Sequence, residues 1–309
     1  RGSLEMRTVL TLLFSVCTST NLFGTTWIVD DDGQDHPSPH FATIQEAVDF
    51  STSGDEILVY PGTYTGVGVD PVIVIENKGL NIRSVVRYGA IIDGEGERRC
   101  VFVNSYAKGG SCTFSDFRFQ NGLAPSHSGG TVFGGGVVLM GRGHALETCL
   151  VFNSVATYGG GVYIASHSSF PPTVIDNCFI NGCHATNGGG LYVSDANVSI
   201  TNTTAVSANT ADNRGGGIYA TQSSFIINEA RILSNSAHQG GGAFFTNQPS
   251  GLETSILNCT VNYNSATHLG AGFAFYSGGF YEILDTSFEY NNAIASNGGQ
   301  GGGGGIFND

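Results

Sequence analysis

An acidic run, DDDGQD, occupies residues 30–35 and could hold a metal ion. Its carboxylates at Asp30, Asp32 and Asp35 stand two to three residues apart, a spacing typical of the oxygen ligands in a calcium loop. The run lacks the bidentate Glu of a complete loop, so an acidic turn is the competing interpretation. Calcium binding by Asp30, Asp32 and Asp35 is therefore a hypothesis, and we expect no other cofactor.

A second possible constellation pairs Asp212 with His238. The two residues occupy equivalent positions in consecutive sequence repeats, so a fold that stacks the repeats would bring them within hydrogen-bond reach. A carboxylate that orients an imidazole is the arrangement of a general base. No nucleophile accompanies the pair, and a solvated pair on a turn is the alternative, so we assign no catalytic residue.

Aromatic residues recur at one position of the repeats, each two residues beyond a glycine triplet: Tyr163, Tyr192, Tyr219 and Phe244. If the repeats stack, these side chains form an outward stripe. Aromatic faces stack on sugars or bury against a partner, which makes the stripe a candidate ligand-binding surface. The alternative is that aromatic residues simply favour strands, or that a loop covers them.

Composition limits the classes of partner. The chain has 309 residues, a net charge of −13 and 40% hydrophobic residues, so it can bury a core. Its second half, residues 130–309, has no Lys and only three cations, Arg142, Arg214 and Arg231. Because nucleic acids are bound mainly through Lys and Arg, this balance argues against a nucleic-acid partner and against a polyanionic substrate on that half.

Cysteines and sequons indicate an oxidising compartment. Cys17 lies in an apolar N-terminal run, and the six remaining cysteines could form three disulfides: Cys100, Cys112, Cys149, Cys178, Cys183 and Cys259. No CxxC pair occurs, so a zinc site is not expected. Sequons at Asn197, Asn202 and Asn258 predict N-glycosylation of a secreted chain.

The elements that would position these residues are repeats of about 25–30 residues. Glycine triplets begin at residues 134, 159, 188, 215 and 240, with GAG at 270 and another triplet at 303. One unit has Gly182 where an Asn is expected. The other units place Asn three positions after an apolar residue: Leu150/Asn153, Val206/Asn209, Ile232/Asn235, Val261/Asn264 and Phe288/Asn291. Two or three short strands per repeat indicate an all-β parallel β-helix, a solenoid.

Stacked coils give the repeated residues a physical role. Inward Asn side chains at a bend can hydrogen-bond the next Asn along a ladder. The glycines permit positive φ at a sharp corner and close approach of successive backbones. Upstream, Thr43 and Glu46 form a capping box for a short helix that would cover the N-terminal end of the solenoid.

Two stretches resemble known families. TIQEAVDFSTSGDEILVYPGTYTG (43–66) and LNIRSVVRYGAIIDG (80–94) resemble the N-terminal cap and first coils of pectin-lyase-like proteins, which implies a right-handed parallel β-helix. The F/V-x-x-N and GGG-[IVL] units resemble the repeats of chlamydial-type polymorphic outer-membrane proteins, which are surface adhesins. Sequence motifs of pectate lyases, pectin methylesterases and polygalacturonases are missing from the coils.

The organisation and location follow from these segments. We expect tag or upstream residues and a signal peptide over 1–24, then one domain over 25–309. That domain divides into a capping region (25–66), irregular coils (67–130) and Gly-rich coils (131–309), and we expect the chain to be truncated. The expected location is extracellular or at the cell surface, with no transmembrane segment in this chain.

These observations favour a secreted or surface-displayed protein with a non-catalytic role in adhesion, surface coating or carbohydrate binding. The alternative is a polysaccharide-active enzyme, either a pectate-lyase-like lyase or a glycoside hydrolase. A carbohydrate or cell-surface partner fits both.

Overall fold

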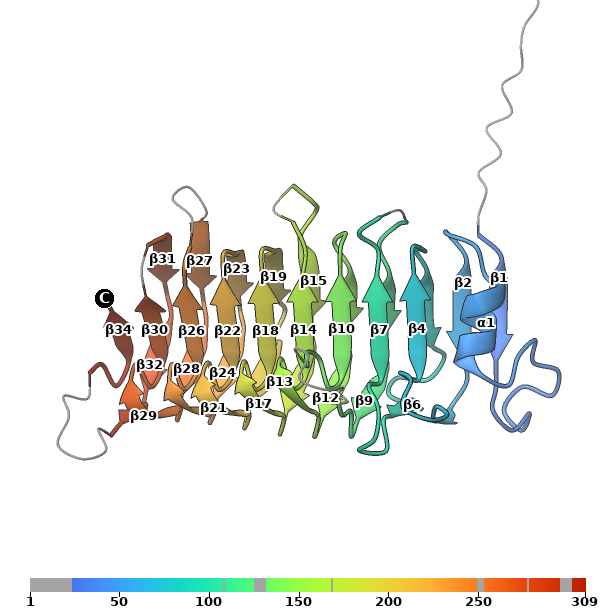
Figure 1. The fold of residues 1–309 in the computed structure, drawn as a ribbon, viewed down its shortest axis with the longest axis horizontal. Helices are drawn as coiled ribbons and strands as arrows, with labels where there is room; N and C mark the ends of the chain where they lie inside the picture. Colours follow the sequence, from blue (N-terminus) through green and yellow to red (C-terminus); the bar gives the residue numbers. More distant parts are fainter. Residues whose placement is uncertain are drawn as a thin grey trace, which may run out of the picture.

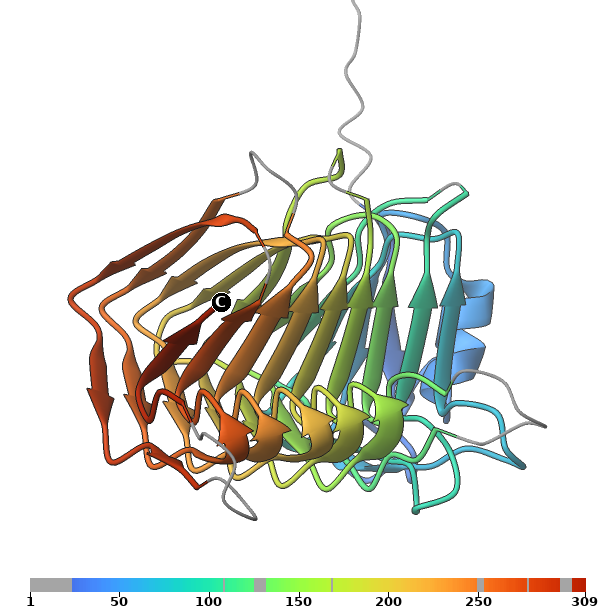
Figure 2. The same cartoon turned by 60° about the vertical axis from the view of Figure 1, so that its left-hand side comes forward.

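The computed structural model is a parallel β-solenoid of about nine turns with very little helix (Figure 1). It describes residues 24–107, 109–124, 132–167, 169–248, 253–276, 278–294 and 302–309. Each turn passes through sheets A, B and C, and the later turns add a short strand of sheet D between B and C. Figure 2 shows the coils stacked behind one another along the long axis.

Sheets A and B carry the first half of each turn. Sheet A contains β1 (Thr26–Val29), β2 (Glu56–Val59), β5 (Asn81–Ser84), β8 (Thr113–Ser115), β11 (Ala145–Glu147), β15 (Thr173–Asp176), β19 (Asn197–Thr201), β23 (Ser224–Asn228), β27 (Glu253–Leu257) and β31 (Phe280–Leu284). Sheet B contains β3 (Gly62–Tyr64), β6 (Ala90–Asp93), β9 (Arg118–Gln120), β12 (Leu150–Phe152), β16 (Phe179–Asn181), β20 (Ala205–Ser207), β24 (Arg231–Leu233), β28 (Thr260–Asn262) and β32 (Ser287–Glu289).

Sheets C and D complete each turn. Sheet C contains β4 (Ile73–Glu76), β7 (Val101–Asn104), β10 (Val137–Met140), β14 (Val162–Ala165), β18 (Leu191–Ser194), β22 (Ile218–Thr221), β26 (Ala243–Thr246), β30 (Phe273–Tyr276) and β34 (Ile306–Asn308). Sheet D contains β13 (Val155–Tyr158), β17 (His184–Asn187), β21 (Thr210–Arg214), β25 (Ser236–Gln239), β29 (Ser265–Leu269) and β33 (Asn292–Ala293).

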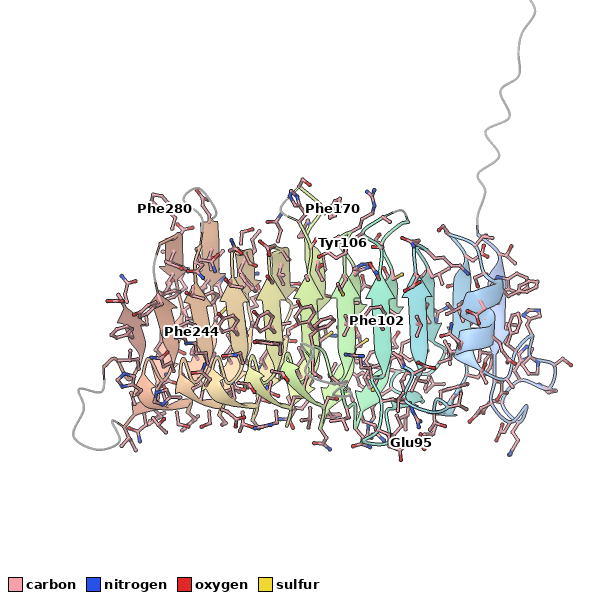
Figure 3. All side chains as sticks on the ribbon, viewed as in Figure 1. Glu95, Phe102, Tyr106, Phe170, Phe244 and Phe280 are labelled. Atoms are coloured by element: carbon pink, nitrogen blue, oxygen red, sulfur yellow. The ribbon has the colours of Figure 1, made fainter. Side chains whose placement is uncertain are left out.

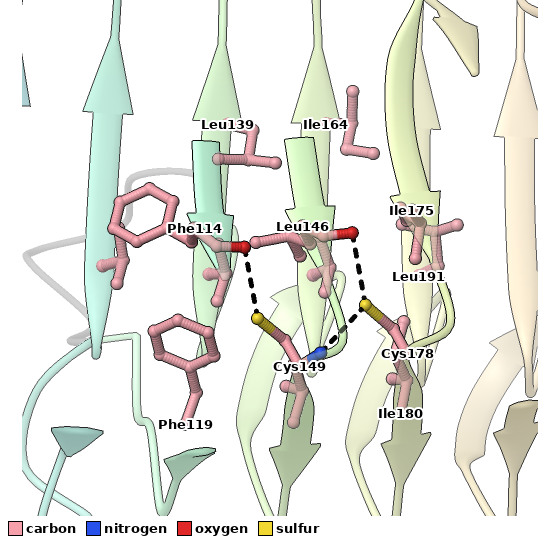
Figure 4. Packing of buried hydrophobic residues seen from close by; sticks show 14 of the residues in the cluster. Phe114, Phe119, Leu139, Leu146, Cys149, Ile164, Ile175, Cys178, Ile180 and Leu191 are labelled. Carbon is pink, nitrogen blue, oxygen red and sulfur yellow. Dashed lines mark hydrogen bonds between the residues drawn. The ribbon is translucent and has the colours of Figure 1, made fainter. Parts of the chain in front are cut away.

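The core consists of rows of apolar side chains that run from coil to coil. Strand residues alternate between interior and exterior, so one inward position per strand stacks on its equivalent in the next coil. The row inside sheet A is at most 1% exposed: Ile57, Ile82, Phe114, Leu146, Ile175, Ile200, Ile227 and Ile256. Figure 4 shows Phe114, Leu146 and Ile175 side by side in this row.

The predicted asparagine ladder is confirmed at the corner between sheets B and D. Asn209, Asn235 and Asn264 are fully buried. The backbone N–H of Asn209 donates to Oδ1 of Asn235 at 3.0 Å, and that of Asn235 donates to Oδ1 of Asn264 at 2.9 Å. Asn291 ends the ladder by accepting from Asn264.

Asn153 does not belong to the ladder, contrary to the prediction. It is exposed, with φ of 49°, and stands at the same corner position as Gly182, whose φ is 66°. The inward ladder position in these two coils is taken by the following residue, Ser154 or Cys183. The inward apolar residue of the earlier coil is Val151 rather than Leu150, so the spacing of three to the ladder position is the same in each coil.

The glycine triplets form another corner, as predicted. The first residue of a triplet adopts positive φ, as Gly215 does at 64°. The second lies against the next coil. A Cβ on Gly216 would stand 2.4 Å from the carbonyl oxygen of Ser236 and 2.5 Å from that of Gly241. Only glycine fits this position without a backbone shift.

One short helix, α1 (Ile44–Phe50), occurs in the described residues. Its predicted capping box is present, with Thr43 and Glu46 bonding each other's backbone N–H. Ile44, Ala47 and Val48 face inward, and the helix packs against β1, β2 and β4 near one end of the solenoid (Figure 1). Its role as an N-terminal cap and the right-handed winding stay predictions. The described chain has no helix that is long and apolar enough to cross a membrane.

The predicted disulfides are wrong for the described residues. All six cysteines, from Cys100 to Cys259, are free and buried. Their thiols point into the apolar interior at the corners, where they hydrogen-bond backbone groups instead of one another. The thiol of Cys149 donates to the carbonyl of Phe114 at 3.3 Å, and the backbone N–H of Cys149 donates to Sγ of Cys178 at 3.4 Å (Figure 4). Cys17 and the predicted signal peptide lie outside the described residues, and the predicted division of the chain stays a prediction.

Candidate functional site

The aromatic stripe runs along the outer face of sheet C. Tyr163, Tyr192 and Tyr219 pair in register on β14, β18 and β22, and Phe244 follows on β26. Neighbouring rings are nearly parallel. The centroids of Tyr192 and Tyr219 are 4.8 Å apart with 14° between the planes, and those of Tyr163 and Tyr192 are 5.4 Å apart with 9°. The stripe therefore exists where it was predicted.

Its geometry differs from a platform for stacking sugars. Because the rings stack on one another, their faces are covered and only the edges and hydroxyls of the tyrosines face outward. Burial raises the pKa of Tyr163, Tyr192 and Tyr219, so the three phenols remain protonated at neutral pH. Tyr163 and Tyr192 can offer hydroxyl groups to a ligand, whereas the hydroxyl of Tyr219 already accepts a hydrogen bond from the side chain of Arg214.

Phe244 offers no surface to a ligand. It is only 1% exposed, and the guanidinium carbon of Arg214 lies 4.9 Å from the centre of its ring (Figure 3). A ligand-binding role for the stripe stays a prediction for the three tyrosines. The ring of Phe244 is buried beneath the guanidinium of Arg214 and so is not available to a ligand.

Asp212 and His238 do not form the expected pair. Oδ1 of Asp212 lies 3.0 Å from Nε2 of His184, on the coil before, while Nδ1 of His238 lies 2.8 Å from the hydroxyl of Thr267. Asp212 and His184 are both well exposed. Both contacts are solvated, as the alternative held, but each joins a partner other than the one considered in the sequence.

Ser105 and His144 form a buried pair that resembles a nucleophile and its base. Nothing in the sequence indicated this pair. Oγ of Ser105 lies 3.2 Å from Nε2 of His144. Nδ1 of His144 accepts the backbone N–H of Cys112 at 3.0 Å, so a neutral ring carries its proton on Nε2 and cannot accept the serine proton. Both residues are at most 1% exposed, so they are structural.

The sequons occupy different environments. Asn202 and Asn258 are exposed at positive-φ corners after sheet A strands. Asn197 is half-buried within β19, where its Oδ1 accepts the hydroxyl of Ser224 at 2.6 Å. Glycosylation at these three positions stays a prediction.

The acidic turn brings three carboxylates together, but not the three that were predicted. Asp30, Asp31 and Asp32 place carboxylate oxygens within 4.8 Å of one another, and Asp35 is not in the group. Oxygens of Asp30 accept the backbone N–H groups of Gly33 at 3.2 Å and of His36 at 2.6 Å. Asp30 therefore holds the turn, and calcium binding stays a prediction.

The surroundings of Asp30 and Asp31 shift the pKa values of their carboxyls in opposite directions. Burial alone would raise the pKa of Asp30, which is 1% exposed, but backbone hydrogen bonds from His36, Asp32 and Gly33 outweigh it and lower the pKa. Asp31 is exposed, but the desolvation that remains, with Asp32 and Asp30 nearby, raises its pKa. Adjacent carboxyls with opposite shifts are a frequent feature of acid–base sites.

Asp31 lines a cavity beside α1, which we call the end cavity. Its volume is about 580 Å³, against 460, 430 and 230 Å³ for three other cavities in the described chain. Its walls are mainly apolar and include Pro71, Val72 and Val74, while Asp31 and Asp70 supply carboxylates. The lining is Asp31, residues 42–45, residues 63–67, residues 70–72 and Val74.

The carboxylate of Asp31 is set in place by its neighbours. It receives a hydrogen bond from the backbone of Thr63. A Cβ on Gly62 would lie 2.3 Å from its Oδ1, so glycine at position 62 leaves the space that the carboxylate occupies. Neither Asp31 nor Asp70 was predicted as a site residue: Asp31 lies in the acidic run at a position not expected to bind metal, and Asp70, 39 residues away, belongs to no motif.

Asp93, in the cavity of about 460 Å³, is a different kind of carboxylate. It accepts Nε2 of Gln120 at 2.6 Å, Nδ2 of Asn121 at 3.1 Å and the N–H of Glu95 at 2.8 Å. Burial alone would raise its pKa, but these bonds and nearby Arg118 lower it. A carboxylate held ionised by so many donors is not a proton donor, so the end cavity is the better candidate site.

Comparison with known proteins finds similar solved structures but no family. No protein-family model matches the sequence, and no curated protein matches it. Pectin methylesterase PemA from Erwinia chrysanthemi has a similar structure, with 10% identity, 87% of this chain and 92% of that chain covered, and a TM-score of 0.43. A pectin methylesterase structure from Aspergillus niger shares 12% identity over 85% of each chain, with a TM-score of 0.36.

These similarities bear on the fold and correct one prediction. The chain has a parallel β-solenoid similar to that of pectin methylesterases, whereas the likeness of its repeats to polymorphic outer-membrane proteins is not shown. The similar solved structures are enzymes by their titles, which contradicts the expected non-catalytic role in adhesion, coating or binding; at these identities and TM-scores they assign no activity to this chain.

Proposed function

We propose that this protein is a polysaccharide-active enzyme and that the end cavity is its catalytic site. The observation that carries the proposal is Asp31, a carboxyl with a raised pKa in a largely apolar cavity that also contains Asp70. A carboxyl whose pKa is raised above its ordinary value is the better proton donor of a pair and can protonate a leaving group, while a second carboxylate serves the reacting carbon.

The chemistry that fits two carboxyls is glycoside hydrolysis. Asp31 would give its proton to the glycosidic oxygen as the bond to the anomeric carbon breaks. Asp70 would stabilise or attack that carbon, and water would supply the hydroxyl group and return the proton. The apolar wall formed by Pro71, Val72 and Val74 would contact the C–H face of a sugar ring.

Hydrolysis fits this cavity better than elimination does. A lyase acting on uronates needs cations beside the uronate and a strong base such as Arg or Lys. The described lining of the end cavity contains neither Lys nor Arg. Together with the net charge of −13, this favours a glycan without carboxylates as the substrate.

The test is hydrolysis of a panel of neutral, cationic and anionic polysaccharides, read as new reducing ends, with unsaturated products as the sign of a lyase. Asp31→Asn and Asp70→Asn should each reduce hydrolysis by about 100-fold or more. Asp35→Asn is the matched control, because it changes the same acidic turn outside the cavity lining. Wild-type protein that acts on no glycan, or activity that survives in Asp31→Asn, would overturn the proposal.

The same proposal includes three predictions made from the sequence: the handedness of the solenoid, the role of α1 and secretion. The solenoid is right-handed, α1 covers its N-terminal end, and the chain is secreted with glycans at exposed sequons. The hydroxyl edge of Tyr163, Tyr192 and Tyr219 is a second contact for a carbohydrate. What supports this contact is the register of the three strands and the outward direction of the phenols.

A further inference from the structure

A groove crosses the outer face of sheet A in the later coils. One cavity of about 430 Å³ lies over β19, β23 and β27, and another of about 230 Å³ lies over β27 and β31. Glu253 and Ser255 line both, so the two cavities adjoin, and we call them together the sheet A groove. It is separate in the sequence from the end cavity, which is built from residues 31–74.

The groove runs along the solenoid axis. Ser199, Ile226, Ser255 and Glu282 are register partners on four successive strands, so they form one row across the sheet. Neighbouring strands are about 4.8 Å apart, so the row repeats at that interval. An extended polymer lying along the axis would meet one such residue in each coil.

The carboxylates of the groove have no internal partners. Glu253 and Glu282 are both exposed, and neither has a side-chain hydrogen bond or ion pair within the described chain. The described lining includes no Lys, Arg or His. Elsewhere, by contrast, Glu95 and Glu97 are paired with Arg98. The groove is therefore a surface of uncompensated negative charge.

The groove also has an aromatic ring whose faces are not stacked on another ring. Phe280 is 70% exposed and pairs in register with Glu253, next to Glu282 on β31 (Figure 3). No ring contact involves Phe280 within the described chain, whereas the tyrosines of sheet C cover one another. A free ring beside two carboxylates suits a ligand that combines sugar rings with positive charge.

We propose that the sheet A groove binds a cationic glycan, namely a polysaccharide of amino sugars with free ammonium groups. Glu253 and Glu282 bind the ammonium groups, the serine hydroxyls bind sugar hydroxyls, and Phe280 contacts a ring face. The site goes beyond the proposed catalysis, because binding here requires no residue of the end cavity. A glycan on Asn197 would enter the groove, so the proposal expects Asn197 to be unmodified.

The experiment measures binding of a glucosamine hexamer to unglycosylated Asp31→Asn protein by titration calorimetry, so that turnover does not interfere. The N-acetylated hexamer is the matched uncharged ligand. Each exposed ion pair contributes up to a factor of about five to the binding constant. The double variant Glu253→Gln with Glu282→Gln should therefore weaken binding roughly tenfold. Phe280→Ala should weaken it as well, and binding should decline with added salt.

Glu229→Gln with Glu289→Gln is the control, since it removes the same charge from exposed positions outside the groove. Unchanged binding in the control and weak binding of the N-acetylated hexamer support the proposal. Equal binding of both hexamers, equal loss in the control pair, or equally tight binding of a lysine oligomer of the same charge would overturn it. Absence of binding by the wild-type groove would overturn it too, without bearing on activity at Asp31.

Discussion

At the scale of single residues, burial decides how a titratable side chain behaves. His144 illustrates this most clearly among the described residues. It is 1% exposed, and burial lowers its pKa to about 4 although a hydrogen bond to the carbonyl of Met140 acts in the opposite direction. The ring is therefore neutral in the folded protein at pH values where a free imidazole would take up a proton.

The consequence is a loss of stability in mild acid. Between the unfolded pKa of about 6.5 and the folded pKa of about 4, the unfolded state binds the extra proton, so unfolding becomes easier as pH falls. The full effect of this shift is about 3 kcal/mol. We predict that denaturant unfolding of the wild type shows a falling free energy from pH 7.5 to pH 5. His144→Gln should show a flatter dependence over this range, and identical slopes would contradict the account.

The sequence alone could not show these environments. It indicated an acidic turn at residues 30–35 and an aromatic stripe, and both exist. The separation of Asp30 from Asp31 depends on which backbone N–H groups the turn directs at each carboxylate. The covering of Phe244 depends on Arg214 reaching over from a neighbouring strand. Neither follows from residue type or spacing.

At the scale of elements, the asparagine ladder at the corner between sheets B and D has the clearest effect on the free energy of unfolding. Oδ1 of Asn235 accepts both the backbone N–H and Nδ2 of Asn209, and its own Nδ2 donates to the carbonyl of Val206. Truncation of this side chain would leave buried donors on Asn209 without an acceptor.

We predict that Asn235→Ala lowers the free energy of unfolding by about 3 kcal/mol, because each buried unsatisfied group costs about 1–3 kcal/mol. Asn213→Ala is the control, since Asn213 is exposed on β21, and should change the free energy by less than about 0.5 kcal/mol. Chemical denaturation of both variants measures the difference. Equal values for the two would show that the ladder does not stabilise the solenoid.

The elements were largely predictable because the repeat fixes them. Glycine triplets, a following apolar strand and an Asn at a bend are local signals, and they predicted coil order, the ladder and the glycine corner. The error at Asn153 arose because the spacing was counted from Leu150, whereas Val151 is the inward residue; two adjacent apolar residues do not show in the sequence which one faces the core. The cysteines were read as disulfides from their number, although their corner positions turn the thiols inward.

At the scale of the whole molecule, stacking creates surfaces that no segment contains. The end cavity joins Asp31 to residues near Asp70, and the sheet A groove joins four coils. Both surfaces carry carboxylates without a Lys or Arg in their described lining. Both surfaces thus share the anionic character of the composition, which is consistent with neutral or cationic glycans.

The most direct test of the central claim is the dependence of hydrolysis on the leaving group in Asp31→Asn. A polysaccharide leaving group needs a proton from the enzyme, whereas an activated aryl leaving group does not. We predict that Asp31→Asn lowers kcat/KM for the polysaccharide by about 100-fold or more and leaves that for a matching aryl glycoside within about tenfold. Equal losses on the two substrates, or no loss on either, would contradict the assignment of Asp31 as the proton donor.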